Sequence, residues 1–282
     1  MTQVHPSTHD KRQSFRRLHA DGCFVIPNPW DIGSTRYLQG MGFKALATTS
    51  SGFAWSQGRP DNGISRDMAL AHLHQIVAVT DLPVNADFES GFAHDAAGVG
   101  ESVRLAIESG VAGLSIEDST GSASAPLYPV EVAVDRMRAA RKAIDQSGGD
   151  TLLVGRAECF VVGRPDLHET IARLNAYAHA GADCLYAPGV HTREQITAVV
   201  KAVAPKPFNL LLVGAIDMTV PEIAELGVRR ISLGGALARA AWGGFMRATR
   251  LIVEHGSFAE LKHAAAGKDL NALFAEHRDT SA

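Results

Sequence analysis

Acidic side chains follow two apolar runs of the sequence at the point where each run ends. One run ends in Asp87, with Glu89 two positions further on, and the next run ends in Glu117 and Asp118. If these runs are neighbouring parallel strands, the four carboxylates converge, and their repulsion calls for a cation. Oxygen ligands without a nearby Cys or His favour Mg²⁺, with Mn²⁺ as the alternative, and Asp87 is the expected direct ligand. The competing interpretation is that these acids cap the helices that follow.

Other polar groups stand at the ends of further apolar runs. Arg156 could hold a substrate carboxylate with its planar guanidinium. Its alternative role is an ion pair with Glu117 or Glu158, and the two roles are compatible. Ser51 and Gly52 could offer a hydroxyl and a backbone N–H to a carboxylate. Together these groups predict a site for a small anionic substrate.

Several more residues are candidates with weaker support from the pattern. The polar stretch 54–66 (AWSQGRPDNGISR) is expected to be a loop over the site, and its Asp61 could gate the site, handle a proton or simply form a turn. Asn209 ends another apolar run and is a candidate substrate ligand. His94 and His191 are possible acids or bases, although most of the 12 histidines must serve the surface or the packing.

The elements that must position these residues alternate between short β-branched runs and longer helical patterns. The expected strands are residues 23–28, 44–50, 82–87, 112–118, 151–158, 182–189, 207–214 and 228–235, and the last helix spans about 236–255. Gly110, Gly181 and Gly227 are expected to end helices in the left-handed conformation. Eight such units predict an α/β fold of the (β/α)8 TIM-barrel type, with the active site at the carboxyl ends of the strands. An open doubly wound sheet is less favoured, because no GxGxxG follows the first strand.

Composition limits the class of protein. The 282 residues are 46% apolar and 20% charged, which predicts a single barrel domain over 1–282 with a helical tail at 256–282. A net charge of −3 without a basic stripe argues against nucleic acid as a partner, and no run reaches the roughly 20 apolar residues of a membrane span. The cysteines Cys23, Cys159 and Cys184 form no metal or disulfide pattern, so we expect a cytoplasmic protein in which Cys159 is a buried apolar residue.

Four short segments, in this order along the chain, resemble the isocitrate lyase/phosphoenolpyruvate mutase superfamily. Ser51-Gly52 followed by GRPD at 58–61 resembles its substrate and gate segment, and DFESGF at 87–92 resembles its DxD-T-G-Y motif. IED at 116–118 and GRAE at 155–158 resemble its IED and ART-D/E motifs. The resemblance covers about residues 24–245.

The resemblance implies a (β/α)8 barrel in which Asp87 binds Mg²⁺ and Glu89 and Glu117 reach it through water. It also implies that Ser51, Gly52 and Arg156 hold the carboxylate of a 2-oxo acid. A metal bound across such an acid acts as a Lewis acid and stabilises an enolate. Superfamily members commonly form tetramers with an exchanged terminal helix, so a helix-swapped homo-oligomer is expected, with the tail after Phe245 available for the exchange.

The chain departs from the superfamily in the loop at 119–128 (STGSASAPLY), which lacks the K-[KR]-C-G-H sequence of the lyases and the lysine-rich loop of the mutases. The mutase histidine after strand six is also missing from 186–189. The proton donor is therefore either solvent or Tyr128. The leading hypothesis is a Mg²⁺-dependent lyase or decarboxylase of a small 2-oxo or 2-hydroxy acid, acting through an enolate, with Asp61, Glu117, Arg156 and Tyr128 as catalytic groups. The alternatives are a C–P bond hydrolase or mutase and a catalytically silent 2-oxo-acid-binding protein.

Overall fold

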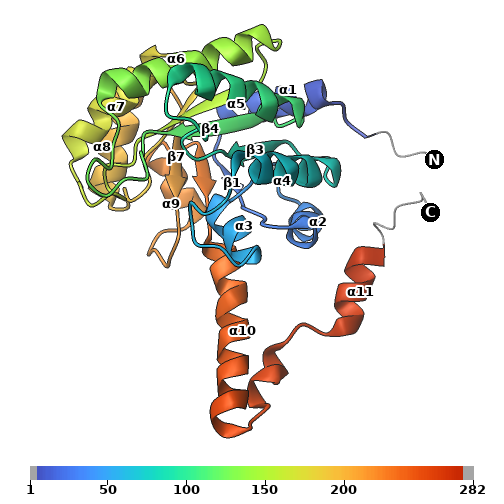
Figure 1. Ribbon diagram of the computed structural model, residues 1–282. Coiled ribbons are helices and arrows are strands. Elements are labelled where there is room, and N and C mark those ends of the chain that lie inside the picture. The colour runs from blue at the N-terminus through green and yellow to red at the C-terminus, as the bar shows by residue number, and fades with distance from the viewer. Residues whose placement is uncertain (1–4, 276–282) are drawn as a thin grey trace.

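The computed structural model describes residues 5–275 and contains eight parallel strands in a nearly closed barrel (Figure 1). The sheet order is β1-β8-β7-β6-β5-β4-β3-β2, and backbone hydrogen bonding across the seam runs from Ala47 N–H to the Pro27 carbonyl at 3.0 Å. The predicted (β/α)8 barrel is therefore confirmed. Its strands are β1 (Phe24–Ile26), β2 (Leu46–Ala47), β3 (Val84–Asp87), β4 (Gly113–Glu117), β5 (Leu152–Arg156), β6 (Cys184–Tyr186), β7 (Phe208–Leu211) and β8 (Arg230–Ser232).

A helix follows each strand, as the alternating pattern predicts, and all of these helices except the last cover the outside of the barrel. Gly110, Gly181 and Gly227 follow three of these helices with φ of +87°, +106° and +89°, the conformation expected of helix-terminating glycines. The helices after the strands are α2 (Ile32–Gly40), α4 (Arg66–Ala78), α5 (Ala96–Glu108), α6 (Val130–Gln146), α7 (Leu167–His179), α8 (Arg193–Val203), α9 (Val220–Glu225) and α10 (Ala236–His255).

Two helices were not expected from the sequence. Helix α1 (Thr8–Ala20) is polar, yet it packs with Phe15 fully buried beside Gly113 at the start of β4. Helix α3 (Ser50–Ser56) occupies the beginning of the predicted loop at 54–66. That prediction is wrong at both of its ends, because residues 54–56 complete α3 and Arg66 begins α4.

The barrel interior contains a polar network around a buried arginine. Arg230 on β8 is 2% exposed and donates from Nε to Asn209 Oδ1 at 2.7 Å and from Nη1 to Asn85 Oδ1 at 3.3 Å. Asn209 in turn donates to Ser232 Oγ at 2.9 Å, and His19 Nε2 lies 3.4 Å from Arg230 Nη1. These contacts satisfy polar groups that would be costly to bury alone.

Burial makes His72 a source of pH-dependent stability. Its ring stacks on Phe53 with centroids 3.9 Å apart, and burial lowers its pKa from 6.5 to about 4. As pH falls from about 6.5 towards 4, His72 is protonated in the unfolded chain but stays neutral in the folded protein. The free energy of unfolding therefore decreases as pH falls through this range. We expect His72→Phe to flatten the fall in unfolding free energy by up to about 1.4 kcal/mol per pH unit in urea titrations between pH 7 and 5. The same substitution at exposed His74 is the control, and equal slopes in the two variants contradict the prediction.

Helix α10 extends away from the barrel, as Figure 1 shows. A short helix, η1 (Ala259–His263), packs against it, and α11 (Gly267–Ala275) returns to α2, where the Phe274 ring lies close to Gly33. The predicted helical tail at 256–282 is thus helical in two pieces, and its residues 276–282 lie outside the described part of the chain. No helix within residues 5–275 has the length and apolar character needed to cross a bilayer.

Candidate active site

The candidate site lies where β3 to β6 end, on the carboxyl side of the barrel. Glu117 is in register with Arg156, and Arg156 is in register with Tyr186. Registered neighbours in a parallel sheet point to the same face, so these three side chains face the same side of the sheet. Asp87 is the last residue of β3 and reaches the same group through Arg156.

Arg156 is the centre of the site. Its Nη1 lies 3.1 Å from Asp87 Oδ1 and 3.2 Å from Glu117 Oε2, and its Nε donates to Glu158. Its guanidinium also lies over the ring of Tyr186, 4.9 Å from the ring centroid. The expected ion pair of Arg156 is therefore present with both Glu117 and Glu158, and a single cation joins three strands.

Asp87 is held from two sides. Its Oδ2 accepts hydrogen bonds from the backbone N–H and the hydroxyl of Ser50, both at 2.9 Å, while Oδ1 accepts from Arg156. The backbone N–H of Asp87 donates to Thr48 Oγ1 at 2.9 Å. The first residue of α3 thus fixes the carboxylate that the sequence nominates as metal ligand.

Negative charge exceeds positive charge at this site. We call Asp61, Asp87, Glu89, Glu117 and Glu158 the acidic cluster. Burial, then the charges of Asp87 and Asp61, raise the pKa of Glu89 to about 8. Burial raises the pKa of Glu117 and of Glu158 as well. For Asp61, partial desolvation by the neighbouring protein and then the negative charge of Asp87 raise the pKa, although the residue is exposed.

Glu89 is the member of the acidic cluster with a buried carboxylate oxygen that lacks a hydrogen-bond partner. It takes a positive φ of 47°, and its Oε1 is enclosed by protein without a hydrogen-bond partner. A buried carboxylate oxygen without a partner is costly, and a hard cation with its water shell would satisfy it. The donor set of the acidic cluster therefore fits a divalent metal ion.

Arg156 determines how such an ion could be held. Within residues 5–275, no three Asp, Glu, His or Cys side chains surround one point closely enough to ligate a metal by themselves. The guanidinium lies between Asp87 and Glu117, the two acids that β3 and β4 present. This arrangement suits an ion with one direct carboxylate and several waters, which is the usual coordination of Mg²⁺.

Asp118 does not join the acidic cluster, so the predicted convergence of four acids is wrong for this residue. Its Oδ2 accepts from Tyr177 at 2.5 Å and from Arg173 at 3.1 Å, and its Oδ1 accepts from the Glu158 N–H at 2.8 Å. Successive residues of a strand point to opposite faces, so the residue after Glu117 points outward towards α7. Asp118 is a structural carboxylate.

The structure brings the other predicted residues together only in part. Tyr128 points its hydroxyl at His94 Nδ1, 3.2 Å away, and its ring covers the guanidinium of Arg136. Among the described residues, Tyr128 makes no hydrogen bond to the acidic cluster. Its role as a proton donor stays a prediction.

The predicted carboxylate-binding residues lie near α3 and within the barrel. Ser51 Oγ is 3.1 Å from Thr49 Oγ1, and the Gly52 N–H donates to the same hydroxyl at 3.2 Å. The Gly52 N–H thus serves the helix cap. The amide of Asn209 is engaged at both ends in the barrel interior. Substrate contacts by these three residues also stay predictions.

Two residues of the site were overlooked as functional groups. The sequence predicts Glu158 only as a partner of Arg156, and Tyr186 stands where the mutases have a histidine. The signal that identifies both is proximity to Arg156, because Tyr186 is its register partner and Glu158 follows two residues later on the same strand end. Cys159 is fully buried, as predicted.

Carboxylates gathered around a buried arginine, at the carboxyl end of a (β/α)8 barrel, lie where enzymes of this fold build their active sites. Residues 15–253 match the family described as phosphoenolpyruvate phosphomutase, and the chain belongs to this family. It is therefore an enzyme of the isocitrate lyase/phosphoenolpyruvate mutase superfamily, as the four segments predict.

Relatives with named activities include lyases, decarboxylases and mutases. An oxaloacetate decarboxylase of Pseudomonas putida GB-1 is 31% identical over 245 residues, which cover 83% of this chain and 82% of that protein. A solved structure from Burkholderia cenocepacia J2315, assigned only to the class lyase/mutase, is 46% identical with a TM-score of 0.92 and covers 95% of this chain and 97% of that one. The structure of 2,3-dimethylmalate lyase is 26% identical with a TM-score of 0.83 and covers 96% and 95%.

Proposed function

We propose that the protein is a Mg²⁺-dependent lyase or decarboxylase that cleaves a C–C bond of a small 2-oxo or 2-hydroxy acid. The observation that carries the proposal is Arg156 surrounded by more carboxylates than it can neutralise, at the carboxyl end of the barrel. The names of the relatives support the reaction class, because the oxaloacetate decarboxylase covers most of both chains.

In this proposal, Asp87 would hold the metal directly, and Glu89 and Glu117 would interact with it through water. When bound, such a metal would supply positive charge at the substrate carbonyl, which makes the carbonyl a sink for electrons. Arg156 binds the adjacent carboxylate, for which its planar guanidinium is suited. Asp61 lies on the loop at 57–65 and acts in closing the site against water.

The loop after β4 favours C–C over C–P chemistry. It folds on itself through a bridge between Ser119 and Leu127 and a hydrogen bond from the Thr120 N–H to the Pro126 carbonyl at 3.0 Å. It carries no lysine, histidine or asparagine that could hold a migrating phosphoryl group. A decarboxylation needs only a sink for electrons and a binding site for the carboxylate.

The test is to incubate the protein and Mg²⁺ with oxaloacetate, 2-methylisocitrate, isocitrate or phosphonopyruvate. The release of pyruvate, glyoxylate and phosphate is measured for each substrate. Pyruvate or glyoxylate from one of the C–C substrates supports the proposal. Phosphate from phosphonopyruvate would assign C–P chemistry instead. Binding of oxo acids without any turnover would make the chain a binding protein.

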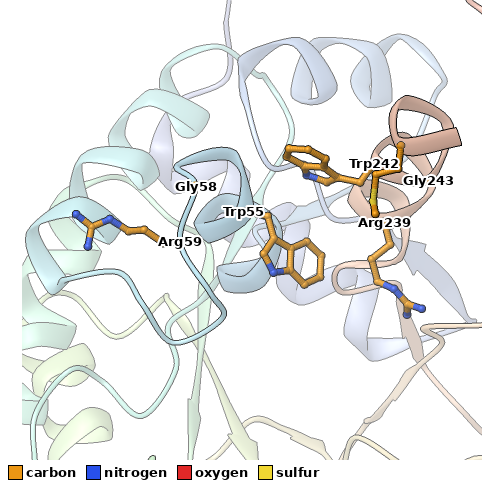
Figure 2. Close-up of a pocket in the computed structure, with 7 residues that line it drawn as sticks. Trp55, Gly58, Arg59, Arg239, Trp242 and Gly243 are labelled. Atoms are coloured by element: carbon orange, nitrogen blue, oxygen red, sulfur yellow. The ribbon is translucent and has the colours of Figure 1, made fainter. Parts of the chain in front are cut away.

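We also propose that the chain forms a homo-oligomer, with a tetramer as the expected state, through α10. Exposed apolar side chains follow one another along this helix, with Phe245 59% and Val253 84% exposed. Between α3 and α10 lies a pocket of about 520 Å³, into which Trp55 and Trp242 point (Figure 2). A second copy of the chain would cover both features, since apolar patches of this kind mark interfaces.

Phe245→Asp is expected to dissociate the assembly, because a charge at the centre of an apolar interface loses its hydration without a partner. Light scattering coupled to size-exclusion chromatography would then show a smaller species than the wild type. Val132→Asp, at an exposed apolar position on α6, is the matched control and should leave the mass unchanged. A monomeric wild-type protein at micromolar concentration would contradict the proposal.

A further inference from the structure

Breaking the C–C bond leaves an enolate that must take up a proton on carbon. Neither the loop at 119–128 nor Cys159 offers a side chain that could supply it. The loop at 119–128 has no titratable side chain except Tyr128, whose hydroxyl is directed at His94. Cys159 is fully buried. If the proposed function holds, the donor is then either solvent or a side chain close to Arg156.

Tyr186 is the residue that the fold brings to this place. It ends β6, in register with Arg156 on one side and Asn209 on the other, so its side chain faces the same side of the sheet as both. The Arg156 guanidinium lies 4.9 Å from the centre of its ring. The ring thus adjoins the group that binds the substrate carboxylate.

The hydroxyl of Tyr186 is unengaged. Within residues 5–275 it makes no hydrogen bond, whereas the hydroxyl of Tyr177 donates to Asp118 and that of Tyr128 pairs with His94. Among the described residues, fully enclosed polar side-chain atoms without a hydrogen-bond partner belong to His72, Glu89 and Arg136, and the Tyr186 oxygen is not one of them. The oxygen of Tyr186 is therefore not fully enclosed by protein, although most of the residue is buried.

The surroundings of Tyr186 suit an acid that gives up a proton and recovers it. Burial, with the charges of Glu158 and Asp87, raises the pKa of Tyr186, so the phenol keeps its proton in the resting site. Arg156 and Arg230 act in the opposite direction on the same group. Arg230 has no carboxylate partner among the described residues, so its charge is available to a transient phenolate.

We propose that Tyr186 is the acid that protonates the enolate carbon. Its O–H bond breaks as a C–H bond forms on the carbon next to the carbonyl, and the enolate electron pair becomes that C–H bond. The phenolate then takes a proton from solvent, so no further reactant is needed. This inference rests on the proposed function and assigns the donor that the loop after β4 lacks.

The experiment compares Tyr186→Phe with the wild type in the full-length, Mg²⁺-loaded protein. The change removes the hydroxyl but keeps the ring over Arg156. We expect kcat for the substrate identified in the panel to fall about 100-fold, with KM changed less than threefold. Exchange of the methyl protons of pyruvate in D₂O, followed by NMR, should slow by a similar factor. Calorimetric binding of oxalate, a mimic of the pyruvate enolate, should be retained.

Two further variants separate a catalytic from a structural role. Tyr177→Phe removes another buried hydroxyl and should leave the exchange rate unchanged. Tyr186→Leu also removes the ring and should raise KM in addition to lowering kcat. Wild-type exchange rates in Tyr186→Phe would overturn the assignment while leaving the proposed function intact. A wild-type protein that neither binds oxalate nor exchanges pyruvate protons would overturn the proposed function and this inference together.

Discussion

Asp87→Ala is expected to lower kcat/KM of the Mg²⁺-supplemented reaction by about 10³-fold or more. The reason is that Asp87 is the proposed direct ligand, and a bound metal contributes several kcal/mol to stabilising developing negative charge. The variant should also lose the rise in melting temperature that Mg²⁺ gives the wild type, because an ion that no longer binds the folded state cannot stabilise it. Initial rates and thermal unfolding, each over a Mg²⁺ titration, measure the two effects.

The matched control for this variant is Asp67→Ala, at an exposed position on α4. It should retain both activity and the response to Mg²⁺. Full turnover in Asp87→Ala would contradict the assignment of Asp87 as the metal ligand. A loss of activity accompanied by an unchanged Mg²⁺-dependent shift in melting temperature would move the metal to another carboxylate of the acidic cluster.

Arg156→Ala is expected to lower kcat/KM by about 10³-fold, with most of the change in KM. Removing one partner of a buried ion pair costs about 3–5 kcal/mol, and the same group is proposed to bind the substrate carboxylate. The unfolding free energy should fall too, because Asp87, Glu117 and Glu158 then face one another without a cation. Steady-state kinetics and urea unfolding report the two effects separately.

Arg156→Lys refines this test, since it keeps the charge but loses the planar fork. Its stability should lie nearer to the wild type than that of Arg156→Ala, while KM stays raised. Arg138→Ala, at an exposed ion pair on α6, is the control for a general loss of charge and should leave both quantities nearly unchanged. An unchanged KM in both Arg156 variants would place the substrate carboxylate elsewhere.

Much of the fold could be predicted because the barrel strands are short, apolar and separated by helices that end in glycine. Helix α1 could not be predicted, because Phe15 is its only fully buried apolar side chain, with Leu18 partly buried beside it, and its other buried residues, Arg12 and His19, are polar. Arg12, for example, is held by the carbonyls of Val111 and Ile107. Such contacts exist only after β4 and α5 have formed, so they leave no apolar periodicity in the sequence.

The location of the site could be predicted from the sequence, but which residues belong to the site could be predicted only in part. Strand ends place Asp87, Glu117 and Arg156 on one side of the barrel, as expected. The sequence could not determine which of two adjacent residues faces inward, because a shift of one residue in the strand exchanges the two faces. That ambiguity made Asp118 appear to be a member of the site. Tyr186 was missed for another reason, because the resemblance to the mutases indicates a histidine at its position.

Helix α3 joins two proposals that have so far been treated separately. Ser50, its first residue, holds Asp87, and Trp55, near its other end, lines the pocket that faces α10. A neighbouring copy that fills this pocket would restrain the whole helix, and with it the carboxylate that binds the metal. Coupling of this kind is reciprocal, so metal affinity would rise with protein concentration, and metal would in turn tighten the assembly.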